Sequence, residues 1–284
     1  HPHAGIRDLD SSLVGSEMCI RDSVSTDGLP GRLYVPPEAE DSPRPVILFL
    51  HGAGETGTNN LGQINRNIDN LLAAAKQRAA FLYAPQATGV VGEIYNWNDM
   101  TRTTNVTAML DQLLVEQNAD PDRVYVTGLS MGGGGSWNMV SRFPDRFAAA
   151  VPIAGVRPDA DFDPAEVLAT PTWAFHARND SIVPFLTSRK VVNDVLSSAG
   201  QPTLTFPRAN DRTTTFKYVD DAIQFRYTEF PTGNHFIWDR VYDTPEVYDW
   251  MFSHAVPEPS SATLLILAIL GACSFGRRHR RDRR

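Results

Sequence analysis

The sequence predicts an α/β fold built on a mostly parallel, doubly wound sheet with helices on both faces. Three observations carry this prediction. Short, continuous apolar runs such as residues 46–50 are typical of strands buried on both faces. Apolar residues at helical spacing follow such runs, as in residues 106–114. The two patterns alternate along the chain, and strands that alternate with helices favour a parallel sheet.

The individual elements follow from these patterns. Strands are expected at residues 33–35 (an edge strand), 46–50, 80–84, 123–127, 147–153, 172–176 and 223–230. Helices are expected at residues 68–75, 106–114, 131–141, 186–196 and 247–252. Residues 207–221 are polar and show no period, so we expect an irregular insertion there, a candidate flap.

Composition limits the classes of function. The 284 residues, 42% of them hydrophobic, suffice for one large core. The net charge is −7, but residues 277–284 carry six arginines and one aspartate, so the rest of the chain carries −12. An acidic body without a basic, aromatic-rich face argues against nucleic acid as a partner. Cys19 and Cys273 both lie outside residues 24–255, which excludes disulfides, thiolate metal sites and a cysteine nucleophile within that segment.

The two ends are expected to lie outside the folded domain of residues 24–255. Residues 1–23 are a doubtful leader, since residues 11–23 resemble translated sequencing-adapter read-through. Residues 256–284 combine a Pro-Glu-Pro tripeptide, an apolar run over residues 262–275 and a terminal arginine cluster. These three parts, in this order, resemble a PEP-CTERM sorting signal. The apolar run is shorter than the roughly 20 residues that span a bilayer comfortably, but its basic end would stay cytoplasmic.

That resemblance implies an exported protein, located in the periplasm, on the outer surface or outside the cell. The C-terminal segment would anchor it transiently in the inner membrane, and an exosortase-like sorting peptidase would process the tail.

The centre of the chain carries a candidate nucleophile. Residues 128–132 read Gly-Leu-Ser-Met-Gly, between an expected strand and an expected helix. A serine at such a reversal, with glycine two positions away on both sides, matches the G-x-S-x-G nucleophile elbow. The alternative is a glycine-rich connection with an incidental serine. The small residues that follow, 133–136, would give the helix clearance where it crosses the sheet.

A serine nucleophile requires a base, and the base requires an orienting acid. His235 follows the last expected strand in a glycine-containing loop, the position that the chain order serine, acid, histidine demands. His51 precedes the elbow and His176 ends a strand, so both are expected to be satisfied core or loop histidines. Asp180 lies four residues beyond a strand and before a helix, which makes it the candidate acid.

The competing acids are weaker candidates. Asp159, Asp161 and Asp163 follow the preceding strand, where capping or solvation of a loop is the expected role. Asp220 and Asp221 lie in the irregular insertion.

The developing oxyanion requires fixed hydrogen-bond donors. The backbone N–H of Met131, at the start of the elbow helix, is one candidate. The N–H of Ala53, in the loop after the first central strand, is the other, with Gly54 as its alternative. Glu55 is a candidate for substrate contact or for orienting this loop, against an ordinary surface glutamate.

Trp97 and Trp238 lie near these motifs in the sequence. Either indole is a candidate for lining a substrate cleft, and core packing is the alternative for both.

Residues 52–57 also match the G-x-G-x-x-G dinucleotide pattern. The segment that follows, residues 56–63, is polar and turn-like, whereas the fingerprint should open a helix. We therefore expect no cofactor and no metal.

Four segments together resemble the carboxylesterase and predicted-peptidase branch of the α/β-hydrolases, which includes dienelactone hydrolases, feruloyl esterases and polyhydroxybutyrate depolymerases. They are residues 50–55, residues 128–133, the loop of residues 179–184 and residues 233–238. The likeness covers about residues 29–253. It implies an α/β-hydrolase fold and hydrolysis of carboxylic esters, on small molecules or on polymer-linked acyl groups. One departure is Ala177-Arg178, where relatives often carry glycine and an uncharged residue.

The sequence therefore predicts a serine esterase that acts through an acyl-enzyme. Ser130 attacks the carbonyl, His235 is the base, Asp180 orients the imidazole, and the N–H groups of Ala53 and Met131 bind the oxyanion. Two alternatives remain. One is a serine peptidase of the prolyl-oligopeptidase type, which usually bears a large extra domain. The other is a non-catalytic exported surface protein that retains the hydrolase fold.

Overall fold

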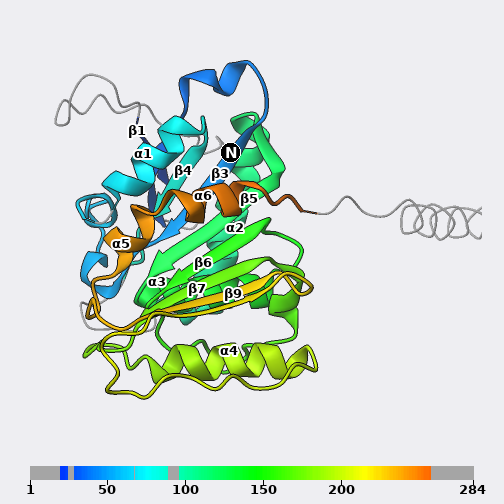
Figure 1. Cartoon of the computed structure of the whole chain (residues 1–284). Helices are drawn as coiled ribbons and strands as arrows, with labels where there is room; N and C mark the ends of the chain where they lie inside the picture. The colour runs from blue at the N-terminus through cyan, green and yellow to red at the C-terminus, as the bar shows by residue number, and fades with distance from the viewer. Residues whose placement is uncertain (1–19, 25–28, 67, 89–95, 257–284) are drawn as a thin grey trace, which may run out of the picture.

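The protein is built around one twisted sheet (Figure 1). The computed structural model describes residues 20–24, 29–66, 68–88 and 96–256. In this part of the chain the strands lie in the order β1-β2-β4-β3-β5-β6-β7-β9-β8. They are β1 Ile20–Val24, β2 Pro30–Tyr34, β3 Arg44–Leu50, β4 Phe81–Pro85, β5 Ala119–Leu129, β6 Ala149–Ile153, β7 Thr172–Ala177, β8 Phe216–Asp220 and β9 Phe225–Phe230. The run from β4 through β3 to β9 is parallel, and β1, β2 and β8 pair antiparallel. The predicted α/β-hydrolase fold is confirmed.

Helices cover both faces of this sheet (Figure 1). The α-helices are α1 Asp69–Gln77, α2 Met100–Glu116, α3 Met131–Arg142, α4 Leu186–Ser198, α5 Trp238–Tyr242 and α6 Pro245–Phe252. Short 3₁₀ turns are η1 Pro37–Glu40, η2 Ala53–Glu55, η3 Gly62–Ile64, η4 Asn96–Asn98 and η5 Glu166–Ala169. Side chains of α2, α3 and α4 share one core, and those of α1, α5 and α6 share the other.

Strand β3 shows why the central runs are continuously apolar. Val46, Leu48 and Leu50 point into the core under α2 to α4, whereas Ile47 and Phe49 point into the core under α1, α5 and α6. Successive side chains of a strand point to opposite faces, so a strand covered on both faces needs apolar residues at every position.

The N-terminal edge differs from the prediction. Residues 33–35 were expected at an edge, but β2 is the second strand, and β1 pairs outside it from Ile20↔Tyr34 to Val24↔Pro30. Most of β1 therefore falls within residues 1–23, which were expected to lie outside the fold. Pairing at a sheet edge uses backbone N–H and C=O groups, which nearly every residue carries, so composition does not reveal it.

The insertion before the last strand is only partly irregular, which corrects a second expectation. Residues Phe216–Asp220 form β8, an antiparallel partner of β9 with Phe216 opposite Glu229. Helix α5 was also not predicted, because five residues are too few to show a helical period.

The expected sorting signal spans residues 256–284. Of these residues the structure describes Val256 alone, and residues 257–284 lie outside the described part of the chain. Among the helices that the structure describes, none is both long and apolar enough to cross a membrane.

Candidate active site

Ser130 lies at the sharp turn that joins β5 to α3, as predicted. Its backbone has φ 56° and ψ −114°, a conformation that non-glycine residues rarely adopt. Two backbone hydrogen bonds hold it there: the Ser130 N–H donates to the Ile153 carbonyl at 2.9 Å, and the Val156 N–H donates to the Ser130 carbonyl at 3.0 Å. The end of β6 and the residues after it therefore fix the elbow.

The glycines around Ser130 are required by close backbone approach. A Cβ on Gly132 would lie 1.8 Å from the Leu50 carbonyl oxygen, and a Cβ on Gly128 would lie 2.4 Å from the Gly132 carbonyl oxygen. Gly133 lies equally close to the backbone at the end of β6, where a Cβ would meet the Ile153 oxygen at 2.4 Å. Helix α3 thus passes directly over the ends of β3 and β6, in agreement with the predicted role of this small-residue run.

The candidate acid and base come from neighbouring parallel strands. Asp180 follows β7, His235 follows β9, and the last residues of the two strands pair as Ala177↔Phe230. His235 Nδ1 lies 2.7 Å from Asp180 Oδ2, and both side chains are buried. The structure therefore brings together the two residues that the sequence singled out 55 positions apart.

Two asparagines, which the sequence analysis did not single out, clamp the acid and base loops together. Asn179 Nδ2 donates to Asn234 Oδ1 at 2.7 Å, and the Asn234 N–H donates to Asn179 Oδ1 at 2.9 Å. Asn234 adopts a left-handed backbone with φ 56°, which asparagine tolerates better than most residues. Asn179 immediately precedes Asp180 and Asn234 immediately precedes His235, and this adjacency is the signal that could have revealed the pair.

The Asp180 carboxylate receives four hydrogen bonds. Oδ1 accepts from the N–H groups of Ile182 at 2.8 Å and Val183 at 2.9 Å, and Oδ2 contacts His235 and also His176 at 3.1 Å. Burial alone would raise the pKa of Asp180, but the hydrogen bonds outweigh burial and hold this pKa well below its usual range. The carboxylate is therefore ionised at neutral pH and can act only as an acceptor.

The loop after β3 lies against the nucleophile. A Cβ on Gly52 would stand 3.7 Å from Ser130 Cβ. The fully buried His51 fixes this loop: Nδ1 contacts the Gly52 carbonyl at 2.6 Å, and Nε2 accepts from the Ala87 N–H at 2.9 Å. Since Nε2 is an acceptor, the proton resides on Nδ1, and burial lowers the pKa of His51 to about 4. His51 is a satisfied loop histidine, as expected.

The two residues that carry the candidate oxyanion donors are the first residues of η2 and of α3. Ala53 is the first residue of η2, directly after Gly52, and Met131 is the first residue of α3. The N–H groups in the first turn of a helix have no partner within that helix, so they are suited to bind a negative oxygen.

Glu55 is the last residue of η2 in the same loop and is buried, with 9% of its surface exposed. A Cβ on Gly52 would lie 3.0 Å from Glu55 Oε2, which places this carboxylate near the nucleophile loop. Burial raises the pKa of Glu55, although hydrogen bonds from the backbone of Gly52 and the charge of Arg66 partly oppose that rise. Glu55 is therefore not an ordinary surface glutamate.

Both candidate tryptophans are buried and pack against histidines of the site. Trp97 has no exposed surface, and its indole N–H donates to the His51 carbonyl at 3.0 Å. Trp238 is 6% exposed and meets the His235 ring edge-on at 5.7 Å. These contacts agree with core packing, which was the alternative to lining a substrate cleft for both tryptophans.

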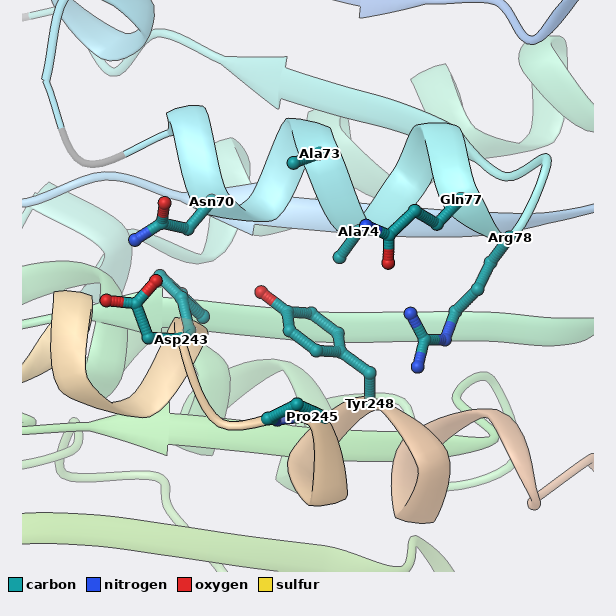
Figure 2. Close-up of a pocket in the computed structure, with 9 residues that line it drawn as sticks. Asn70, Ala73, Ala74, Gln77, Arg78, Asp243, Pro245 and Tyr248 are labelled. Atoms are coloured by element: carbon teal, nitrogen blue, oxygen red, sulfur yellow. The ribbon is translucent and has the colours of Figure 1, made fainter.

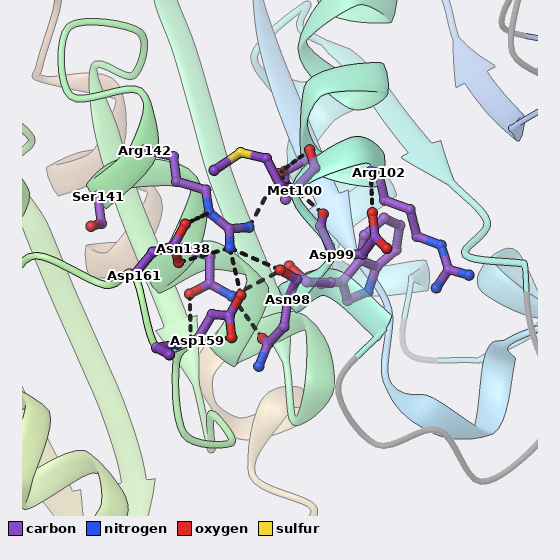
Figure 3. Close-up of polar contacts among 12 residues, drawn as sticks. Asn98, Asp99, Met100, Arg102, Asn138, Ser141, Arg142, Asp159 and Asp161 are labelled. Atoms are coloured by element: carbon purple, nitrogen blue, oxygen red, sulfur yellow. Dashed lines mark hydrogen bonds and ion pairs between the residues drawn. The ribbon is translucent and has the colours of Figure 1, made fainter.

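A polar cluster around Arg142 ties the turn that carries Trp97 to helix α3 (Figure 3). The Arg142 guanidinium donates to the Asn98 carbonyl at 2.8 Å and pairs with Asp159 at 2.8 Å and Asp161 at 2.9 Å. Asn138 Nδ2 donates to Asn98 Oδ1 at 2.7 Å. Two of the competing acids, Asp159 and Asp161, thus pair with Arg142 and hold the loop after β6.

His176 is buried and satisfied, as expected, but one of its partners was not anticipated. Its Nε2 contacts Asp180, so two histidines bind the same carboxylate. The i, i+4 spacing between His176 and Asp180 at a strand end is the signal in the sequence that could have suggested this contact.

A cavity of about 200 Å³ lies between α1 and the α5–α6 pair (Figure 2). Asn70, Arg78, Asp243 and Tyr248 are among the residues that line it, and none of the candidate triad residues does. It is therefore separate from the site built around Ser130. Within the described ranges, no group of three or more histidine, cysteine or acidic side chains is arranged so that it could bind a metal ion.

Comparisons with known proteins place this chain in a family. The sequence matches the Dienelactone hydrolase family over residues 31–203, a range that contains Ser130 and Asp180. It is 32% identical over 151 residues to the poly(3-hydroxybutyrate) depolymerase of Ralstonia pickettii, covering 48% of this chain and 31% of that protein. It is 28% identical over 142 residues to the bifunctional acetylxylan esterase/xylanase XynS20E of Neocallimastix patriciarum, covering 50% of this chain and 20% of that protein.

The crystal structure of a thermostable esterase superposes with a TM-score of 0.66 at 28% identity, covering 84% of this chain and 63% of the other. The chain spans less than a third of the length of the two curated relatives named above. Because the family match covers more than half of the chain, from β2 through α4, this protein belongs to the dienelactone hydrolase family.

Proposed function

We propose that the protein is a serine carboxylesterase that acts through an acyl-enzyme. The observation that carries this proposal is the 2.7 Å contact between His235 Nδ1 and Asp180 Oδ2. It lies at the carboxyl ends of β7 and β9, the same edge of the parallel sheet at which β5 ends and Ser130 follows. Ligands of open α/β sheets bind at this edge.

The proposed chemistry follows from which nitrogen of His235 carries the proton. Asp180 accepts a hydrogen bond from the Nδ1–H of His235, which keeps the proton on Nδ1 and leaves Nε2 unprotonated, able to remove the Ser130 hydroxyl proton. The serine oxygen attacks the ester carbonyl, and the N–H groups of Met131 and Ala53 stabilise the resulting oxyanion. His235 returns the proton to the leaving alcohol. Water, activated by the same imidazole, then hydrolyses the acyl-enzyme and releases the acid.

Esters of a polymer, either in its backbone or attached to it, are the substrate class that we favour. Two relatives are named for such esters, a poly(3-hydroxybutyrate) depolymerase and an acetylxylan esterase. We also propose that the protein acts outside the cytoplasm after processing by a sorting peptidase. This location rests on the sequence pattern of residues 257–284 alone.

The first prediction tests the nucleophile. Ser130→Ala should lower kcat/KM for p-nitrophenyl acetate by about 10⁴–10⁶, because removing a triad serine leaves only the oxyanion donors and substrate binding. The matched control is Ser197→Ala, on the exposed face of α4. A fluorophosphonate should label the wild type and this control but not Ser130→Ala.

Acetylated xylan and 3-hydroxybutyrate oligomers, assayed in parallel, separate the two polymer classes. A wild-type protein that neither cleaves esters nor reacts with the fluorophosphonate would contradict the proposal. Cleavage of peptides in place of esters would identify a peptidase.

A further inference from the structure

The acid of the candidate triad has a second histidine partner. His176 Nε2 lies 3.1 Å from Asp180 Oδ2, the same oxygen that His235 Nδ1 contacts at 2.7 Å. His176 is fully buried at the end of β7, on a different strand from the one that precedes His235. The mechanism described above assigns this second imidazole no task.

The neighbours of His176 determine where its proton lies. Nε2 is 3.1 Å from both Asp180 Oδ2 and the Val183 carbonyl, and an ionised carboxylate and a carbonyl can only accept. Nε2 therefore carries the proton. Nδ1 lies 2.7 Å from Ser188 Oγ, whose hydroxyl can donate to it. A neutral imidazole thus satisfies every contact, in a chain of donors that runs from Ser188 through His176 to Asp180.

The other charged groups near this chain neutralise one another. Glu229, paired in register with His176 on β9, accepts from Arg178 and Arg189, each at 2.7 Å. Asp211 lies 3.6 Å from Arg178. These groups come from the residue after β7 (Arg178), from β9 (Glu229), from α4 (Arg189) and from the segment before β8 (Asp211). Two cations therefore face two anions, and Asp180 is left as the charge that His176 contacts directly.

We propose that His176 is a positioning residue for ester hydrolysis: its Nε2–H fixes the rotation of the Asp180 carboxylate and takes up part of the charge on Oδ2. This inference rests on the proposed function. Without that donor the charge of Oδ2 would act on His235 alone. The protonated form of His235 would then be stabilised, and the base would be lost at a higher pH. The carboxylate would also gain rotational freedom, which would slow the reaction.

The experiment compares a variant that lacks the donor with one that retains a donor. His176→Met has a similar length and no N–H, whereas His176→Gln places an amide N–H near the position of Nε2. The readouts are kcat and KM for a p-nitrophenyl ester from pH 5 to pH 9, together with the thermal unfolding temperature.

In His176→Met the acidic midpoint of kcat/KM should rise by about 0.5–1 pH unit, and kcat should fall about tenfold. His176→Gln should keep the midpoint within about 0.2 unit of the wild type. KM should change little in either variant, because His176 is buried behind Asp180.

Two further measurements cover a variant that fails to fold or a protein without turnover. Ser188→Ala keeps both histidines but weakens the Nε2–H donor, so it should shift the midpoint in the same direction by a smaller amount. The Nδ1–H proton of His235, observed by low-field NMR, should move downfield in His176→Met and in Ser188→Ala, whether or not ester is cleaved.

Matching midpoints and matching His235 proton shifts in the wild type and these variants would overturn the inference. A loss of stability or of kcat without a change in the pH profile would also overturn the inference, because a purely structural role of His176 predicts that result. An inactive wild type with the expected NMR shifts would instead overturn the esterase proposal and leave the contact between His176 and Asp180 established.

Discussion

At the residue scale, the strained backbone of Ser130 is the feature on which the site depends. A non-glycine residue at φ 56° and ψ −114° costs on the order of 1–3 kcal/mol, so neighbouring contacts must hold it. The backbone bonds to Ile153 and Val156 give part of that support, and the close contact of α3 with β3 adds to it. This contact is possible only because residue 132 has no side chain.

A methyl group at residue 132 tests that dependence. In Gly132→Ala the new Cβ would lie 1.8 Å from the Leu50 carbonyl oxygen, a rigid backbone atom, so α3 or β3 must move. We expect the free energy of unfolding, measured by urea denaturation, to fall by about 3 kcal/mol or more.

The matched control is Gly54→Ala in the neighbouring turn, where a Cβ would meet no atom within 4 Å. Its free energy of unfolding should stay within about 0.5 kcal/mol of the wild type. Equal losses in the two variants would show that the close approach of α3 to β3 is not what requires glycine.

At the element scale, a buried ion network joins the loop after β7, strand β9, helix α4 and the segment before β8. Arg178 has a fully buried guanidinium that contacts Glu229, and it also donates to the carbonyls of Asp211 and Thr214. Arg189 completes the pairing from α4. Arg178 was the departure from the family pattern next to Asp180. Its side chain is engaged in this network, so it leaves the acid loop undisturbed.

Removing the central carboxylate tests the strength of this network. Glu229→Gln would remove the carboxylate that two guanidinium groups, one of them fully buried, contact at 2.7 Å, and would leave Asp211 at 3.6 Å from Arg178. The free energy of unfolding should fall by about 3 kcal/mol, because an uncompensated buried charge is costly.

The matched control is Asp194→Asn, which neutralises the carboxylate of a pair with Lys190 whose side chains are 40% and 71% exposed. That loss should be below about 1 kcal/mol. Urea denaturation of both variants at pH 7 makes the comparison, and similar losses would contradict a structural role of the buried network.

At the scale of the whole molecule, the sequence located most of the sheet and the candidate site. The buried strands β3 and β5 were recognisable because apolar residues are needed on both of their faces. Ser130, Asp180 and His235 were recognisable because the chemistry requires their types in that order. β1 was not predicted, because backbone pairing at an edge leaves little trace in composition. The contact of His176 with Asp180 depends on the exact course of the loop after β7, which no periodicity encodes.

Acid should destabilise the whole protein through Asp180 and Glu229. Hydrogen bonds and ion pairs hold both pKa values below their ordinary values of 3.8 and 4.5, despite the opposing effect of burial. The unfolded chain therefore takes up protons first as the pH falls. The stability that these ionised groups contribute is present above about pH 4 and is lost as the pH falls through the lower, folded-state values. Glu55 has the opposite effect on stability in acid. Burial raises its pKa, so the folded chain takes up this proton before the unfolded chain does.

The measurement is the free energy of unfolding between pH 3 and pH 7 for the wild type and Asp180→Asn. The variant cannot ionise at residue 180, so its stability should decline less steeply in acid. Parallel curves would show that Asp180 contributes nothing to the acid dependence.

The four glycines of residues 132–135 also affect how the site is assembled. Each glycine in a helix costs about 1 kcal/mol relative to alanine, so this first part of α3 has little tendency to be helical alone. It becomes helical through its contacts with Leu50, Ile153 and Trp97, which belong to β3, β6 and η4. The nucleophile should therefore be ordered late in folding, after the strands on both sides have paired. A partly folded chain would then carry no activated serine, and reactivity would arise only once the core is complete.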